Sequence, residues 1–147
     1  KIIRLRQNYY ALSLAQVDWE ALAIEMLKPS YLSFEYGLWR HGLIDEIPAR
    51  LTLATTKKSR TYLMPGRVLE YSHLNPGLFF GYQMDKQALL ALPEKAFLDE
   101  LYLISLKKRS LNLASLETKK LDKKLIKKWL KKYPVYTRRL VEKILKF

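Results

Sequence analysis

Lysines near the C-terminus are the residues of this 147-residue chain whose type and spacing most clearly predict a chemical role. Between Asp122 and Lys132 they recur on one side of a predicted helix, whereas apolar residues recur on the other side. Like charges four positions apart destabilise a helix by roughly 0.2–0.5 kcal/mol per pair, and few acidic residues balance them here. A polyanion would relieve this repulsion, so we predict that the lysines contact phosphate groups of a nucleic acid. The predicted set comprises Lys119, Lys120, Lys123, Lys124, Lys127, Lys128 and Lys131.

A second candidate phosphate-binding segment lies in the middle of the chain. The cations Lys57, Lys58 and Arg60 belong to the string from Thr55 to Arg60, which we expect to form the bend of a β-hairpin. The alternative interpretation of this string is a solvated turn without a ligand. The lysine-rich helix has two alternative interpretations as well, a solvated outer face and a contact surface for anionic lipid.

Residue types that commonly carry catalysis are sparse. The chain has no cysteine and two histidines, His41 and His73, which we interpret as structural residues. Its five glycines form no phosphate-binding loop. We therefore predict no catalytic residue, no metal site and no cofactor. The enzymatic alternative is a metal-dependent nuclease that would use Asp45, Glu46 or Asp99.

A predicted helix over residues 94–106 gathers several of the remaining carboxylates. Glu94 lies in its first turn, where the helix dipole favours a negative charge. We expect Glu94 and Lys95 to anchor this helix by a local ion pair. Asp99 and Glu100 are neighbours in the helix and therefore point in different directions, which argues against a catalytic carboxylate pair.

Charge is distributed unevenly along the chain, which has a net charge of +13. Residues 1–106 contain 12 basic and 11 acidic residues, whereas residues 107–147 contain 15 basic and 3 acidic ones. The positive field that would attract a polyanion therefore comes from the C-terminal segment. No apolar run approaches the roughly 20 residues of a membrane span, so we predict a cytoplasmic protein that spans no membrane.

Hydrophobic periodicity predicts an α+β fold, with a small, mostly antiparallel sheet packed with helices and followed by a basic helical C-terminal segment. We expect Asp18, Ser30 and Thr137 to be helix caps and Gly42 to end a helix. The predicted strands span residues 1–14, 50–56, 60–64, 67–73, 78–84 and 87–92. Predicted helices follow Asp18 and Ser30, span residues 94–106 and 122–132, and follow Thr137.

Eight short segments between residues 1 and 105 match one known family in their order and spacing. They are Tyr9–Leu12, Pro29–Glu35, Tyr36-Gly37, His41–Ile44, Ala54–Lys57 with Arg60, Tyr71–Leu74, Leu78–Tyr82 and Ala91–Asp99. Together they resemble the AbiEi family of antitoxins from bacterial type IV toxin–antitoxin systems, which act in abortive infection, a form of phage defence. The chain departs from the family at Leu92, where a small or capping residue is expected before Pro93.

The resemblance implies a winged helix-turn-helix joined to an antitoxin domain. It also implies a transcriptional autorepressor that binds operator DNA and neutralises a cognate nucleotidyltransferase-like toxin, directly or indirectly. By this resemblance, residues 1–13 are the remnant of a winged helix whose base-reading part is expected outside this chain. Residues 14–106 would be the AbiEi-like antitoxin domain, and residues 107–147 a basic helical tail beyond the resemblance. The alternative is a stand-alone nucleic-acid-binding module without an antitoxin role.

Overall fold

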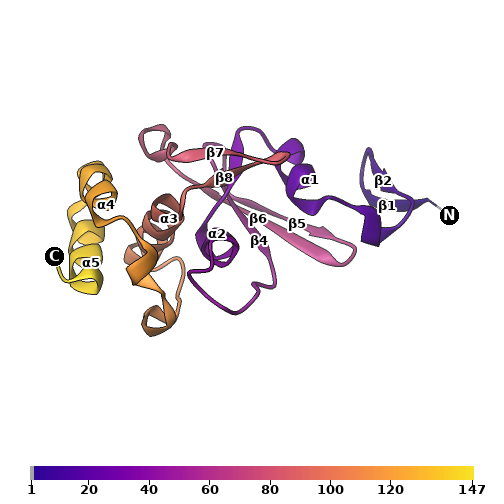
Figure 1. The fold of residues 1–147 in the computed structure, drawn as a ribbon. Helices are drawn as coiled ribbons and strands as arrows, with labels where there is room; N and C mark the ends of the chain where they lie inside the picture. The colour runs from indigo at the N-terminus through magenta and orange to yellow at the C-terminus, as the bar shows by residue number, and fades with distance from the viewer. Residues whose placement is uncertain (1) are drawn as a thin grey trace.

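A mixed sheet lies at the centre of the structure, a computed structural model that describes residues 2–147 (Figure 1). In this part of the chain, six strands form the sheet in the order β5-β6-β4-β3-β8-β7. Strands β4 and β6 are parallel, as are β3 and β8, whereas the other neighbours are antiparallel. The strands are β3 (Ser30–Leu32), β4 (Leu51–Thr55), β5 (Arg60–Met64), β6 (Arg67–His73), β7 (Tyr82–Asp85) and β8 (Ala88–Ala91).

Helices cover the sheet, and two of them lie beyond one of its ends (Figure 1). They are α1 (Trp19–Met26), α2 (Phe34–Arg40), α3 (Pro93–Ser105), α4 (Lys123–Leu130) and α5 (Val135–Leu145). One hydrophobic core joins the sheet to α2 and α3, and the side chains of Ile126 and Val141 from α4 and α5 belong to it. A second core, on the side of Leu32 and Leu53, contains Ala23 of α1. The predicted α+β class with a basic helical C-terminal segment is thus confirmed.

The first residues form a hairpin rather than the single strand predicted for residues 1–14. Strands β1 (Ile3–Arg6) and β2 (Tyr9–Ala11) pair antiparallel and form a separate two-stranded sheet (Figure 1). Asn8 adopts a φ of 70°, a left-handed conformation that asparagine tolerates in turns. The turn residue in the middle of the run was the signal that distinguishes the hairpin from one long strand.

The helix predicted after Ser30 begins later, so the capping role of Ser30 was wrong. Ser30 is in β3, which pairs with β4 and β8, and its hydroxyl donates to the carbonyl of Leu27 at 2.6 Å. Helix α2 begins at Phe34 instead. The predicted capping by Asp18 is confirmed, because its carboxylate accepts from the backbone N–H of Ala21. The predicted stop at Gly42 fits its left-handed φ of 72°.

Strands β4 and β5 do not form the predicted hairpin around Lys57 and Lys58. Strand β6 lies between them, parallel to β4 and antiparallel to β5. His73, at the end of β6, fixes the loop that crosses over: its backbone N–H donates to the Ser59 hydroxyl at 2.8 Å. Its ring Nδ1 lies 3.0 Å from the carbonyl oxygen of Lys57.

Two further boundaries differ from the prediction. The strand expected over residues 78–84 is a short 3₁₀ helix, Pro76–Leu78, followed by β7. The last helix begins after Pro134, and Thr137 does not cap it. Thr137 is completely buried in the first turn of α5, where its hydroxyl lies 2.8 Å from the Ser105 hydroxyl of α3. This contact attaches α5 to α3.

Candidate functional site

The lysines of α4 form an exposed face, as the sequence predicted. Asp122 caps the helix and accepts from the backbone N–H groups of Lys124 and Leu125 at 3.0 and 3.3 Å. Ile126 and Leu130 are buried on the opposite side. The exposed lysines of this face are Lys123, Lys124, Lys127, Lys128 and Lys131, and we call them the α4 lysine face. Across residues 2–147, the ion pairs involve none of these five lysines.

The other predicted phosphate-binding residues fall into two groups. Lys119 and Lys120 end a short 3₁₀ helix, Thr118–Lys120, just before α4. The Lys120 ammonium donates to the carbonyl of Gly42 at 2.9 Å, so part of its hydrogen-bonding capacity is used inside the protein. Lys57 and Lys58 belong to the loop between β4 and β5, and Arg60 is the first residue of β5. Arg60 donates to the hydroxyl of Tyr62 in its own strand.

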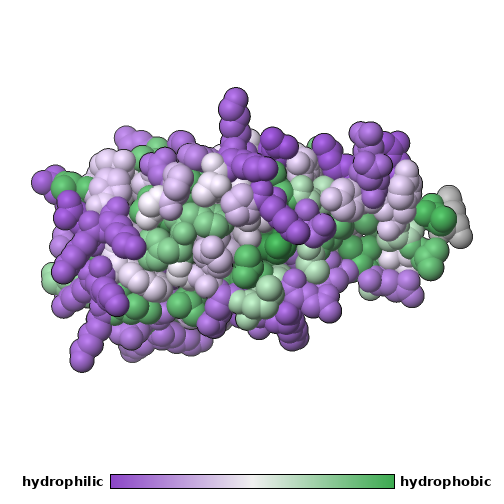
Figure 2. Space-filling view, turned by 90° about the horizontal axis from the view of Figure 1, so that it is seen from above, coloured by the Kyte–Doolittle hydropathy of each residue, from purple (hydrophilic) through white to green (hydrophobic). Residues whose placement is uncertain are grey.

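Helix α5 adds cations that the predicted set omitted. Arg139, Lys143 and Lys146 are exposed, and the aromatic ring of Phe147 lies 4.7 Å from the Lys127 ammonium. This contact brings the end of α5 beside the α4 lysine face. Figure 2 shows hydrophilic side chains gathered at the end of the molecule where α4 and α5 lie. The high net charge of residues 107–147 was the sequence signal that could have included these three residues.

Contacts to α3 and to Phe80, in the segment before β7, hold the two basic helices in place. The carboxylate of Glu94 accepts from the backbone N–H of Asp122 at 2.9 Å, at the start of α4. Edge-to-face aromatic contacts add to this, with ring centroids 5.3 Å apart for Phe80 and Trp129 and 6.0 Å apart for Tyr102 and Tyr133. The α4 lysine face is therefore presented on a fixed support.

A buried polar cluster lies under this support. The Lys95 ammonium pairs with the carboxylate of Asp99, and both side chains are completely buried. Asp99 also accepts from the hydroxyls of Tyr31 and Ser33, each at 2.7 Å. The local ion pair expected of Glu94 and Lys95 thus forms between Lys95 and Asp99, one turn further along α3.

Burial governs the protonation of this pair. It lowers the pKa of Lys95 and raises the pKa of Asp99, whereas the attraction between the two groups opposes both shifts. At Gly81, whose φ is 77°, a Cβ atom would lie 3.0 Å from the Lys95 side chain. The aliphatic part of Lys95 is thus closely enclosed, and a substrate would reach it only by opening the core. We interpret the pair as a structural element.

No family model, no curated protein and no solved structure matches this chain. The similarity to AbiEi antitoxins therefore stays a prediction from the ordered sequence segments.

The three carboxylates of the nuclease alternative lie in different environments. Asp45 and Glu46 are exposed and line a groove of about 710 Å³ beside Ser110 and Asn112, whereas Asp99 is buried in the core. Among residues 2–147, no group of three or more histidine, cysteine or acidic side chains is placed to hold a metal ion. The ring Nε2 of His41 lies 2.6 Å from the Ala91 carbonyl oxygen, which agrees with the structural role predicted for it.

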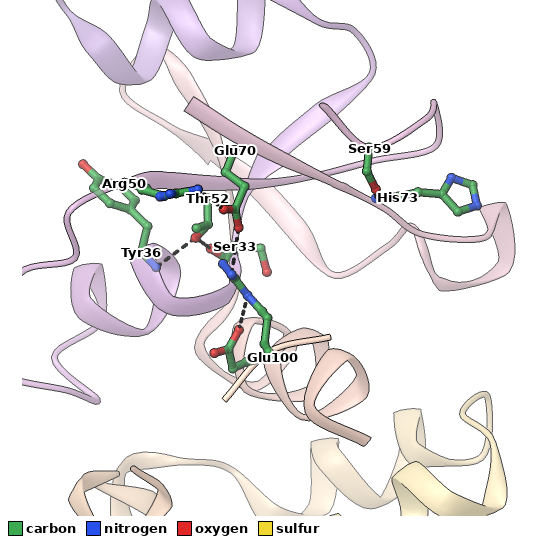
Figure 3. A network of polar contacts seen from close by, with 9 residues as sticks. Ser33, Tyr36, Arg50, Thr52, Ser59, Glu70, His73 and Glu100 are labelled. Carbon is green, nitrogen blue, oxygen red and sulfur yellow. Dashed lines mark hydrogen bonds and ion pairs between the residues drawn. The ribbon is translucent and has the colours of Figure 1, made fainter. Parts of the chain in front are cut away.

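Arg109 links three elements in a network that sequence reasoning missed. Its guanidinium donates to Glu70 of β6 at 2.8 Å and to Glu100 of α3 at 3.0 Å. It also lies 5.5 Å from the ring centroid of Phe34, at the start of α2. Figure 3 shows Glu70 and Glu100 on opposite sides of these contacts, with Arg50 beside Glu70. Arg109 thereby fixes the point at which the chain leaves α3 toward the basic helices.

Proposed function

We propose that this protein binds nucleic acid through a basic surface made of α4 and α5. One observation carries the proposal: five lysines are exposed on one side of α4, while the other side is packed in the core. Lysines in this arrangement supply contacts to phosphate groups, which give affinity and position the ligand without reading its sequence. Within residues 2–147, no ion pair involves these five lysines, so their charge stays available to a ligand. No helix in the described chain is long and apolar enough to cross a bilayer.

The wider role that we propose is that of an antitoxin and transcriptional autorepressor component of a type IV toxin–antitoxin system. The ordered AbiEi-like segments between residues 1 and 105 support this role. The partners would be operator DNA and a nucleotidyltransferase-like toxin, neutralised directly or indirectly in the cytoplasm. We propose no catalytic activity for the chain. A stand-alone nucleic-acid-binding module is the second candidate, favoured by the location of the α4 lysine face outside those segments.

The salt dependence of binding tests the nucleic-acid proposal. If five lysines contact duplex phosphates, the logarithm of the association constant falls against the logarithm of salt concentration with a slope of about −4 to −5, at roughly 0.9 per contact. Fluorescence anisotropy with random-sequence duplex DNA, measured over a series of salt concentrations, gives this slope. A slope near zero would overturn direct phosphate binding by the α4 lysine face.

Co-expression tests the antitoxin proposal. We expect the chain to restore growth of cells that express a nucleotidyltransferase-like toxin encoded beside it. The control is the toxin with an unrelated basic protein of similar size, which should not restore growth. Growth arrest that persists in the presence of soluble chain would favour the stand-alone module.

A further inference from the structure

Arg109 and four further charged side chains form a cluster, of which Figure 3 labels Arg50, Glu70 and Glu100. The three carboxylates are Glu35 of α2, Glu70 of β6 and Glu100 of α3, and the second guanidinium is that of Arg50, just before β4. The two oxygens of Glu70 accept from Arg50 at 2.7 Å and from Arg109 at 2.8 Å. Glu70 therefore pairs with both guanidiniums. Glu100 pairs only with Arg109, which it shares with Glu70.

Glu100 is the most deeply buried carboxylate of this cluster. Its side chain is 1% exposed, and one of its oxygens accepts from Arg109. Its other oxygen is buried without a hydrogen-bond partner, and so is the Nη2 group of Arg109. A cavity of about 250 Å³ adjoins the cluster and is lined by Glu35, Arg50, Glu70 and Arg109 among others. With three carboxylates against two guanidiniums, a single proton would balance the charge.

We propose that this cluster binds one proton at Glu100, and that loss of the proton leaves a buried carboxylate whose desolvation favours local opening of the segment that Arg109 anchors. Burial raises the pKa of Glu100 to about 7; Arg109 opposes this shift, while Glu35 and Glu70 reinforce it. These three residues, with Arg50 behind Glu70, are the charged groups that face Glu100. The inference does not depend on the proposed function, because it concerns the anchoring of residues 107–122 alone.

The direction of the pH effect follows from proton linkage. An acid whose pKa is higher in the folded than in the unfolded protein holds more protons when folded, so acidification stabilises the fold between the two values. Below pH 7 the neutral carboxyl group of Glu100 is compatible with its buried site. Above pH 7 the carboxylate is ionised and pairs more strongly with Arg109, but its second oxygen stays buried without a hydrogen-bond partner, so an opening that hydrates this oxygen is favoured. The chain beyond α3 then opens locally more often.

Carbon-13 NMR of the glutamate carboxyl groups in the full chain tests proton binding directly. We expect one glutamate to titrate with a midpoint near 7, and its signal to be absent from the Glu100→Gln variant. Should this variant fail to fold, Glu35→Gln, which changes a partly exposed residue, is expected to shift the same midpoint downward. Titration of every glutamate below about pH 5.5 would overturn the proposal.

Hydrogen exchange at several pH values tests the effect on the anchor. After correction for the intrinsic exchange rate, protection of amides 107–116 is expected to fall by up to about tenfold per pH unit above 7. Glu100→Gln should remove this dependence. The control Glu117→Gln neutralises an exposed glutamate in the following segment and should leave the dependence intact. Protection that stays constant with pH while Glu100 titrates would refute the link between the proton and the anchor.

Discussion

Replacing Lys95 with methionine is expected to lower the free energy of unfolding by about 3–5 kcal/mol. The substitution keeps the aliphatic volume but leaves the carboxylate of Asp99 buried without its counter-charge. The hydroxyls of Tyr31 and Ser33 still donate to Asp99, yet two neutral donors do not replace an ammonium. Urea unfolding followed by circular dichroism measures the loss.

Lys95→Met combined with Asp99→Asn removes both charges, so we expect it to be more stable than the sum of the two single losses predicts. The matched control is Lys28→Met, because Lys28 pairs with Glu25 in an exposed ion pair whose side chains are 65% and 62% exposed. Exposed pairs of this kind contribute at most about 1 kcal/mol. Equal losses for Lys95→Met and Lys28→Met would contradict the structural role of the buried pair.

Caps and apolar spacing predicted those helices in which one periodic pattern of apolar residues determines the buried side. In α4, the cap residue Asp122 and the apolar spacing that includes Ile126 and Leu130 define both the start of the helix and its buried side. In α3, the proline at the first position marks the start correctly. These signals lie within one or two turns of chain, so they do not depend on the rest of the fold.

The order of the strands could not be predicted in the same way. All five residues of β4 are buried, which fits a strand with a neighbour on each side, here β3 and β6. The short segment between β4 and β5 favoured a hairpin, but pairing between distant parts of the chain decided the topology. Strand β3 is only three residues long, too short to show an alternating pattern, and the helical spacing that starts at Leu32 obscured it.

Charged residues inside the core were the main feature that the sequence concealed. Lysine and aspartate are ordinarily exposed, so Lys95 and Asp99 favoured a solvated side of α3. Their spacing of four residues was the one available signal of a pair on the same helix face. Arg109 follows two lysines and resembled the end of a solvated helix, whereas its partners, Glu70 and Glu100, are 39 and 9 residues away in sequence.

Neutralising the α4 lysine face is expected to have the largest effect on nucleic-acid binding. Changing all five lysines to glutamine should weaken binding to random-sequence duplex DNA by at least about a thousandfold near 0.1 M salt, because counterion release contributes roughly eightfold per phosphate contact. The slope against salt should become shallower by about 4 to 5. The fold should persist, since the substitutions remove repulsion between lysines four positions apart and touch no buried side chain.

A variant with the same change in net charge separates local contacts from the overall field. It carries glutamine at five cations of the remaining structure, namely Lys28, Lys57, Lys58, Arg60 and Lys86. If the α4 lysine face makes the contacts, this control keeps most of the salt slope, because long-range attraction is screened beyond roughly 10 Å at 0.1 M salt. Equal weakening by both variants would mean that net charge alone drives binding. A larger loss in the control would instead assign the phosphate contacts to the loop between β4 and β5.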